Sequence, residues 1–194
     1  MGEEHLLICN CKSIRNEENM PTIESQLNVR IMRKAEATMH PFTDHFKGFE
    51  NVGAVRQIFG EETEEVLRNL KVEFSGRNGY MGVSDDDGHL MVSACYLNNG
   101  DIVDIYLDIV HELVHVKQFM DGKELFDRDY DYAERPTEIE AYRHVVEEAR
   151  RLGLDDDRIR EYLRTEWMSD EDLTLLAKIV GVKCKRVKEK ANHR

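Results

Sequence analysis

The densest run of apolar residues in the chain lies within Asp101–Met120. Apolar side chains, such as Ile105 and Leu113, would occupy nearly every side of the helix that this segment forms. A helix that is apolar nearly all round is normally buried. Asp101 is a favourable N-cap residue, and Gly122 follows as a helix terminator. The pattern therefore predicts a buried helix that ends near Met120.

Before this helix, the apolar spacing indicates three shorter helices. The first would run from Pro21 to about His40, with apolar residues at helical spacing along one side. The other two would cover Ala54–Phe59 and Glu61–Leu70, separated by Gly60, because glycine readily breaks a helix. Residues 1–70 are therefore predicted to form a helical extension packed on the core, without readable chemistry of their own.

From residue 71 onward, short alternating apolar runs replace the helical pattern. Lys71–Ser75 is predicted to be a strand, and Tyr80–Ser84 and His89–Leu97 are predicted to form a hairpin. The segment between them, Asp85–Gly88, ends in Asp-Gly, a common hairpin turn. Its aspartates lack the spacing and the final glutamate of an EF-hand, so we interpret the segment as a turn rather than a calcium loop.

Three further helices are predicted after the buried one, at Thr137–Leu152, Asp155–Trp167 and Ser169–Gly181. Strands in the middle of the chain with helices on both sides favour an α+β fold with a small antiparallel or mixed sheet. We expect residues 71–152 to form the core and residues 153–181 to be C-terminal helices of the same domain.

The charge of the chain is strongly negative but unevenly distributed. A net charge of −12 argues against general binding of nucleic acid. Residues 182–194 nevertheless carry six basic side chains against one acid, Glu189. This segment is predicted to be a disordered, solvated tail, and a contact with an anionic partner is the alternative.

The composition also bears on the compartment. No apolar run approaches the length of a membrane span, and the first residues are acidic where a secretion signal would be basic. The four cysteines do not form a disulfide framework: they are Cys9, Cys11, Cys95 and Cys184. We therefore expect a cytoplasmic protein with reduced thiols. Cys9-x-Cys11, with His5 nearby, could bind a metal or coordinate and block a metal in the active site, but we interpret it as incidental.

One line of polar residues runs along the otherwise apolar helix. Steps of four and three residues place the following side chains on one face: Asp104, Asp108, His111, His115 and Gln118. A polar stripe on a buried helix requires partners that satisfy it. A metal would satisfy the two histidines, and Asp108 could accept the second ring N–H of His111. The alternative is that both histidines are hydrogen-bonded core groups.

The middle of this stripe carries the most specific motif in the chain, because residues 111–115 read His-Glu-Leu-Val-His. On a helix, His111 and His115 lie one turn apart and can hold one Zn²⁺. Glu112 then lies beside the open coordination position as a general base. The motif indicates a metal, an activated water and hydrolysis of a peptide bond.

The next predicted helix offers two carboxylates as a third ligand, which a catalytic zinc requires. Glu138 shares the apolar, inward face of that helix with Tyr142, whereas Glu140 shares the solvent face. Glu140 also has a structural role available, because Thr137-x-x-Glu140 matches a capping box. We therefore predict that Glu138 is the ligand and keep Glu140 as the alternative.

The order of these motifs resembles the gluzincin class of zinc metallopeptidases. His-Glu-x-x-His on one helix, followed by Glu-x-x-Ala at Glu138–Ala141, is similar to the ImmA/IrrE-type regulatory peptidases and to the membrane-bound CAAX-processing peptidases. The resemblance covers roughly residues 71–150. It implies a zincin-like core in which a buried active-site helix and a ligand helix meet.

The resemblance also implies roles for single residues. His111, His115 and Glu138 would be the zinc ligands, with Glu112 as the general base. Extended substrate would add to an edge strand, which the pattern locates at His89–Leu97. Tyr142 occupies a position where related proteins often have Asp or Asn.

The tetrahedral oxyanion of peptide hydrolysis needs a hydrogen-bond donor besides the metal. We assign this catalytic role to Tyr142, and its alternatives are Tyr130, Tyr132 and His144. All four lie in the predicted ligand helix or in the loop before it. The motif itself does not supply this donor.

Taken together, the residues predict a zinc metallopeptidase whose substrate is a peptide or a protein. One alternative is a regulatory or binding protein on a zincin fold, with weak, latent or single-target proteolysis. Another is a structural helical domain with an accidental motif. Zinc content separates the structural domain, which would hold none, from the other two. The variant Glu112→Gln should lose peptide cleavage and keep zinc. If it still performs its biological role, the peptidase interpretation fails. No oligomeric state is predicted from the sequence.

Overall fold

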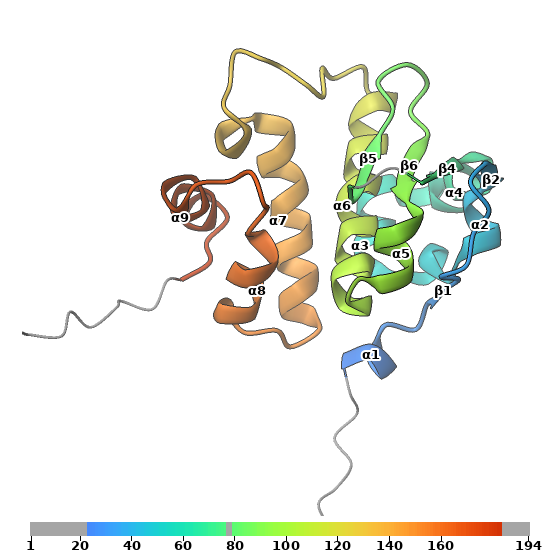
Figure 1. Cartoon of the computed structure of the whole chain (residues 1–194), viewed down its shortest axis with the longest axis horizontal. Helices are drawn as coiled ribbons and strands as arrows, with labels where there is room; N and C mark the ends of the chain where they lie inside the picture. The colour runs from blue at the N-terminus through green and yellow to red at the C-terminus, as the bar shows by residue number, and fades with distance from the viewer. Residues whose placement is uncertain (1–22, 77–78, 184–194) are drawn as a thin grey trace, which may run out of the picture.

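The computed structural model describes residues 23–76 and 79–183 and shows an α+β fold. The long helix α6 (Ile102–Met120) lies at its centre (Figure 1). The sheet and the N-terminal helices lie on one side of α6, and the C-terminal helices lie on the other. Buried apolar residues from both sides, from Leu27 to Val182, form one core around α6.

A four-stranded mixed sheet has the order β2–β4–β6–β5. Its strands are β2 (Met39–Pro41), β4 (Lys71–Ser75), β5 (Met81–Val83) and β6 (Leu90–Ser93). β4 and β6 are parallel, and the other two pairs are antiparallel. Alternate side chains such as Phe74 and Val92 are buried, so one face of the sheet forms part of the core.

The prediction of one helix from Pro21 to His40 is wrong for the described part of that segment. Helix α1 (Ile23–Gln26) spans only four residues, and Asn28 then adopts a left-handed backbone conformation with φ 52°. Such a residue ends a helix. The chain continues as β1 (Arg30–Ile31), which pairs with β3 (Phe46–Lys47), and then as β2, which pairs with β4. Strands therefore form where the apolar spacing predicted a helix.

The two other predicted N-terminal helices are confirmed. They are α3 (Gly53–Phe59) and α4 (Thr63–Asn69), and Gly60 between them has φ 58°. Short elements surround them: α2 (Phe42–His45) and the 3₁₀ helices η1 (Phe49–Asn51) and η2 (Gly60–Glu62). The phenylalanines of this region, including Phe42 and Phe46, pack tightly in the core beside the sheet.

The strand Lys71–Ser75 and the hairpin after it are confirmed, but the second hairpin strand is shorter than predicted. β6 ends at Ser93, whose hydroxyl accepts a hydrogen bond from the Tyr96 amide at 3.3 Å and caps α5 (Ala94–Asn99). Cys95 therefore lies on a helix. β6 is also an inner strand, so the prediction that His89–Leu97 is the edge strand is wrong, and β5 occupies that edge.

The buried helix is confirmed with its predicted cap. The Asp101 carboxylate accepts hydrogen bonds from the amides of Val103 and Asp104 at 3.0 and 3.1 Å. The helix ends at Met120, and Gly122 follows with φ 73°. None of the helices in the described ranges is both long enough and apolar enough to cross a membrane.

The ligand helix α7 (Pro136–Arg151) is confirmed, but its predicted capping box is wrong. Pro136, whose fixed φ suits the first helical position, starts the helix one residue earlier than expected. Thr137 therefore lies inside the first turn, and its hydroxyl donates to the Leu125 carbonyl. Glu140 accepts from Gln118 instead of from a cap amide.

Two helices complete the described chain, α8 (Asp156–Leu163) and α9 (Asp170–Ile179), both capped by polar residues. α8 is shorter than predicted, and Trp167 lies in the loop after it. The capping box of α9 is present between Ser169 and Asp172. The expectations for Cys9, Cys11 and the basic tail after Lys183 fall outside the residues that the structure describes.

Candidate metal centre

The structure brings the three predicted ligands together between α6 and α7. His111 and His115 project from one face of α6, and Glu138 projects from the first turn of α7. The Glu138 Oε2 atom lies 3.3 Å from Nε2 of His111 and 3.5 Å from Nε2 of His115. The two Nε2 atoms are 3.0 Å apart. Each residue is only 6% exposed.

This triangle of donor atoms fits a metal ion. Ligands about 2.0–2.1 Å from a tetrahedral zinc lie about 3.3 Å from one another, which is close to the three observed distances. Glu138 Oε2 is buried without a hydrogen-bond partner among the described residues. A buried, unsatisfied carboxylate oxygen beside two imidazole nitrogens is a donor set that would hold a metal. The geometry does not choose the metal.

A basic side chain supports Glu138 from the opposite side. The Arg135 guanidinium lies 3.8 Å from Oε1 of Glu138, so the two carboxylate oxygens face different partners. Arg135 is itself held by the Asp127 carbonyl, to which its Nε donates at 3.1 Å. This arrangement directs Oε2 toward the histidines.

The protonation behaviour of the three residues reflects their mutual contact. Burial disfavours the charge on Glu138, but the two histidine imidazoles beside Oε2 outweigh burial and lower the pKa of its carboxyl. Burial also disfavours the charge on His115, yet the contacts with Glu138 and Glu112 raise its pKa to about 9. The pKa of His111 is lowered, chiefly by burial. The group is thus a buried carboxylate closely paired with imidazoles.

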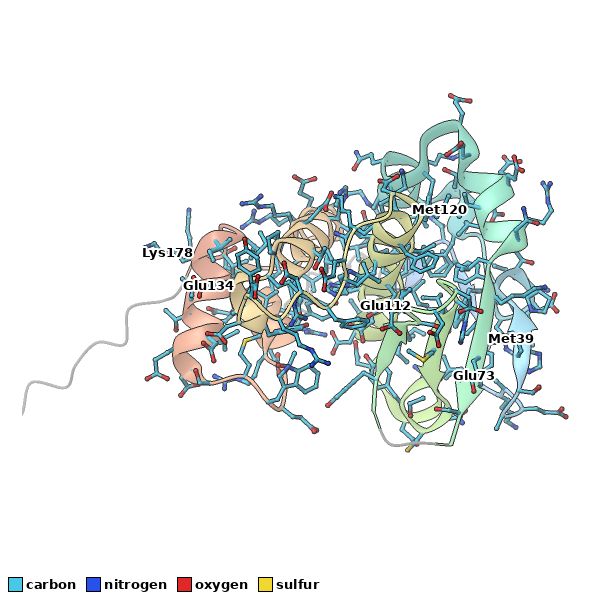
Figure 2. The ribbon with its side chains drawn as sticks, turned by 90° about the horizontal axis from the view of Figure 1, so that it is seen from above. Met39, Glu73, Glu112, Met120, Glu134 and Lys178 are labelled. Atoms are coloured by element: carbon cyan, nitrogen blue, oxygen red, sulfur yellow. The ribbon has the colours of Figure 1, made fainter. Side chains whose placement is uncertain are left out.

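Glu112 lies in the same cavity and is not one of the three ligands. Figure 2 shows Glu112 in the middle of the molecule, between the sheet and the C-terminal helices. The cavity measures about 420 Å³ and is lined by Glu112 together with all three predicted ligands. Glu112 is 8% exposed, and burial raises its pKa to about 8. A cation held by the ligands would lower that pKa and favour the charged, basic form.

The remaining acids of the polar stripe have partners on the C-terminal helices. Asp104 forms an ion pair with Arg158 of α8. Asp108 accepts hydrogen bonds from the hydroxyls of Tyr96 and, at 2.8 Å, Tyr162. Burial raises the pKa of Asp108 to about 6 although both hydroxyls oppose the shift.

The expected contact between Asp108 and His111 is absent, because the two tyrosines occupy the carboxylate. His111 Nδ1 has no hydrogen-bond partner within residues 23–76 and 79–183. No local sequence pattern pointed to Tyr96 or Tyr162 as partners, since they lie 12 and 54 residues from Asp108.

Tyr142 lies against the ligand group. Its ring meets the His111 imidazole edge-on, with ring centroids 4.5 Å apart. Its hydroxyl is 2.9 Å from the hydroxyl of Tyr132, and both residues line the cavity. Burial raises the pKa of Tyr142, so the hydroxyl keeps its proton. Tyr130 and His144, the other candidates, are not among the residues that line the cavity.

An aromatic group at the cavity mouth was not predicted. Trp167 is 61% exposed, and its ring centroid lies 6.2 Å from that of Tyr80 and 6.0 Å from that of Tyr132. The Tyr80 hydroxyl also donates to Glu166 at 2.9 Å. The start of β5 thereby contacts the loop after α8. No local sequence pattern connects Trp167 with Tyr80 or Tyr132, because they lie far apart in the chain.

Comparison of the chain with protein-family models, with curated proteins and with solved structures gives no match in any of the three. The assignment of a function therefore rests on the residues of the site and on their geometry.

Proposed function

We propose that the protein is a zinc-dependent metallopeptidase of the gluzincin type, with a peptide or protein as its substrate and the cytoplasm as its location. The observation that carries the proposal is the convergence of Glu138 on the two histidines of His-Glu-Leu-Val-His, with Glu112 in the same cavity. Two motifs 23 residues apart in the sequence, counted from His115 to Glu138, thus meet as one donor set.

Zinc is the metal that the His-Glu-x-x-His motif favours for this donor set. Two imidazole nitrogens and one carboxylate oxygen are a known ligand set of catalytic zinc, which keeps a fourth position open. His111, His115 and Glu138 would hold the ion. When bound, zinc supplies a Lewis acid that polarises a carbonyl group and lowers the pKa of a water molecule.

Glu112 supplies the proton transfer. It lines the cavity beside the ligands and belongs to the same helix as both histidines. In peptide hydrolysis, its carboxylate would accept a proton from the attacking water and pass it to the leaving amine. Burial in a confined cavity keeps the carboxylate close to the reacting atoms and away from bulk water.

The tyrosine pair supplies a donor for the developing oxyanion. Tyr142 and Tyr132 share a hydrogen bond at 2.9 Å on one side of the ligand group. Both residues line the cavity, and a tyrosine hydroxyl there can stabilise negative charge on the substrate oxygen. Tyr142 is the first choice because its ring also packs on His111.

The sheet supplies a surface for an extended substrate. β5 is an edge strand, and all three of its residues line the cavity that contains the ligand group. The backbone groups on its free edge can pair with an added peptide strand. We therefore assign to β5 the substrate-holding role that the sequence interpretation gave to His89–Leu97, and we propose that the sheet, α6 and α7 form a zincin-like core.

Zinc analysis and one isosteric substitution test this proposal. The protein as purified, or reconstituted after chelation, should contain one zinc per chain, and His111→Ala should contain none. Glu112→Gln should keep zinc but lose cleavage of a peptide library. A wild-type protein without stoichiometric zinc refutes the proposal. A Glu112→Gln protein that retains its biological activity favours the regulatory alternative.

A further inference from the structure

Gln118 is the most completely buried polar residue of the stripe on α6. It is 1% exposed and lies three residues after His115. It makes three hydrogen bonds: its Oε1 lies 2.7 Å from Nδ1 of His115, and its Nε2 donates to the Thr137 carbonyl at 3.0 Å and to Glu140 Oε2 at 2.8 Å. It therefore connects one candidate ligand with the first turn of α7.

The orientation of the Gln118 amide follows from its partners. A carbonyl oxygen and a carboxylate oxygen can only accept, so the amide NH₂ must face Thr137 and Glu140. The amide oxygen is then left facing His115. Lys123 donates to the same Glu140 oxygen at 2.7 Å and holds that carboxylate in position. The network admits only this orientation.

A fixed acceptor at this position determines which nitrogen of His115 keeps its hydrogen when the ring is neutral, the form that binds a metal. Because Gln118 Oε1 accepts, Nδ1 of His115 must donate, and Nε2 is the nitrogen left for a metal. Nε2 is also the atom that faces Glu138 and the other histidine. His111 has no such support, since its Nδ1 is without a partner among the described residues.

We propose that Gln118 is a positioning residue for the metal centre. Thr137 and Glu140 hold its amide in place, and the amide oxygen then fixes the orientation of the His115 ring with hydrogen on Nδ1. The inference rests on the proposed function, because it assigns a role at the same site. It makes the two histidines unequal: His115 is oriented before the metal arrives, and His111 is oriented by its contacts with Glu138 and Tyr142.

Two measurements test the inference. One is zinc affinity, determined by competition with a chromophoric chelator, and the other is thermal unfolding of the metal-free protein. Gln118→Met fills a similar volume but offers no amide acceptor. We expect its zinc affinity to fall about ten- to hundredfold, the range for loss of a group that orients a ligand.

Tyr106→Phe is the matched control. It removes another buried hydrogen bond between α6 and α7, that of the Tyr106 hydroxyl with Glu148, without touching the ligand group. Both single variants should lower the unfolding temperature of the metal-free protein, but only Gln118→Met should lose zinc affinity. Wild-type affinity in Gln118→Met, or an equal loss in Tyr106→Phe, overturns the inference.

A second measurement needs no variant and applies even if Gln118→Met fails to fold. Long-range ¹H–¹⁵N correlation spectra of the zinc-loaded wild type should show His115 protonated at Nδ1. An unprotonated Nδ1 overturns the role of Gln118. A wild type that binds no zinc contradicts the proposed function itself, so the two failures are distinct.

Discussion

The ring of Tyr142 lies edge-on against the imidazole of His111, and its hydroxyl reaches Tyr132 on the other side. The ring and the hydroxyl therefore serve separable purposes. The ring packs against one candidate ligand, and the hydroxyl pairs with that of a second residue that lines the cavity.

Tyr142→Phe should separate the two purposes. The variant keeps the ring against His111, so zinc content should equal that of wild type. Loss of the hydroxyl should lower kcat by about 10²–10³, the usual effect of removing one oxyanion donor. Steady-state cleavage of a peptide and zinc analysis on the same sample measure both effects. Tyr132→Phe is the matched comparison, and a larger loss in that variant would move the donor role to Tyr132.

Zinc should stabilise the fold through its ligands. A ligand that binds only the folded state, present at a hundredfold excess over its Kd, adds about 2.7 kcal/mol to the free energy of unfolding. The unfolding temperature of the wild type should therefore rise with added zinc, and that of Glu138→Gln should rise much less. Calorimetric scans with zinc and with chelator check this. An equal rise in both proteins would show that zinc binds elsewhere.

The carboxyl of Asp108 predicts a pH dependence of stability. Its pKa is raised by burial to about 6 in the folded protein, so the folded state binds the proton more tightly than the unfolded state. The stabilisation from this proton is complete below the ordinary pKa near 4 and is lost as pH rises through 6. Between pH 5 and 7.5, the wild type should lose about 1 kcal/mol that Asp108→Asn does not lose.

Urea unfolding of the metal-free proteins at several pH values measures this difference. Subtraction of the two curves removes the contributions of the histidines and of Glu112, which are common to both proteins. If the two curves run parallel from pH 5 to 7.5, Asp108 does not titrate in this window.

The contact of Tyr106 with Glu148 predicts a purely structural effect. Tyr106 is fully buried on α6, and Glu148 on α7 also accepts two hydrogen bonds from Arg151, at 2.7 and 2.6 Å. Tyr106→Phe should lower the free energy of unfolding by about 1–3 kcal/mol, because a hydrogen bond to a buried charged group is lost. Chemical denaturation measures the loss, and the zinc content of the folded variant should stay at the wild-type level.

Local patterns were sufficient for the elements whose ends are set by nearby residues. Asp101 and Gly122 bound α6, Gly60 separates α3 from α4, and Ser169 caps α9, so these elements could be predicted from the sequence. The inward position of Glu138 also followed from helical periodicity, because the apolar face of α7 has to meet α6.

The wrong predictions depended on partners distant in the sequence. Met39–Pro41 is a strand because it pairs with β4. The pattern of residues 21–40 alone contains no information about that partner. β6 is an inner strand because it lies between β4 and β5, and β5 is therefore the edge strand on this side of the sheet. The contacts of Asp108 with Tyr162 and of Tyr80 with Trp167 likewise join residues far apart in the chain, and no short pattern encodes them.

The ligand group divides between two helices that are separated by the loop of residues 121–135. Its completeness therefore depends on the docking of α7 onto α6, and any bound ion would join these two helices as a reversible cross-link. Removal of the ion would then be felt first at the contact between these two helices, rather than in the sheet.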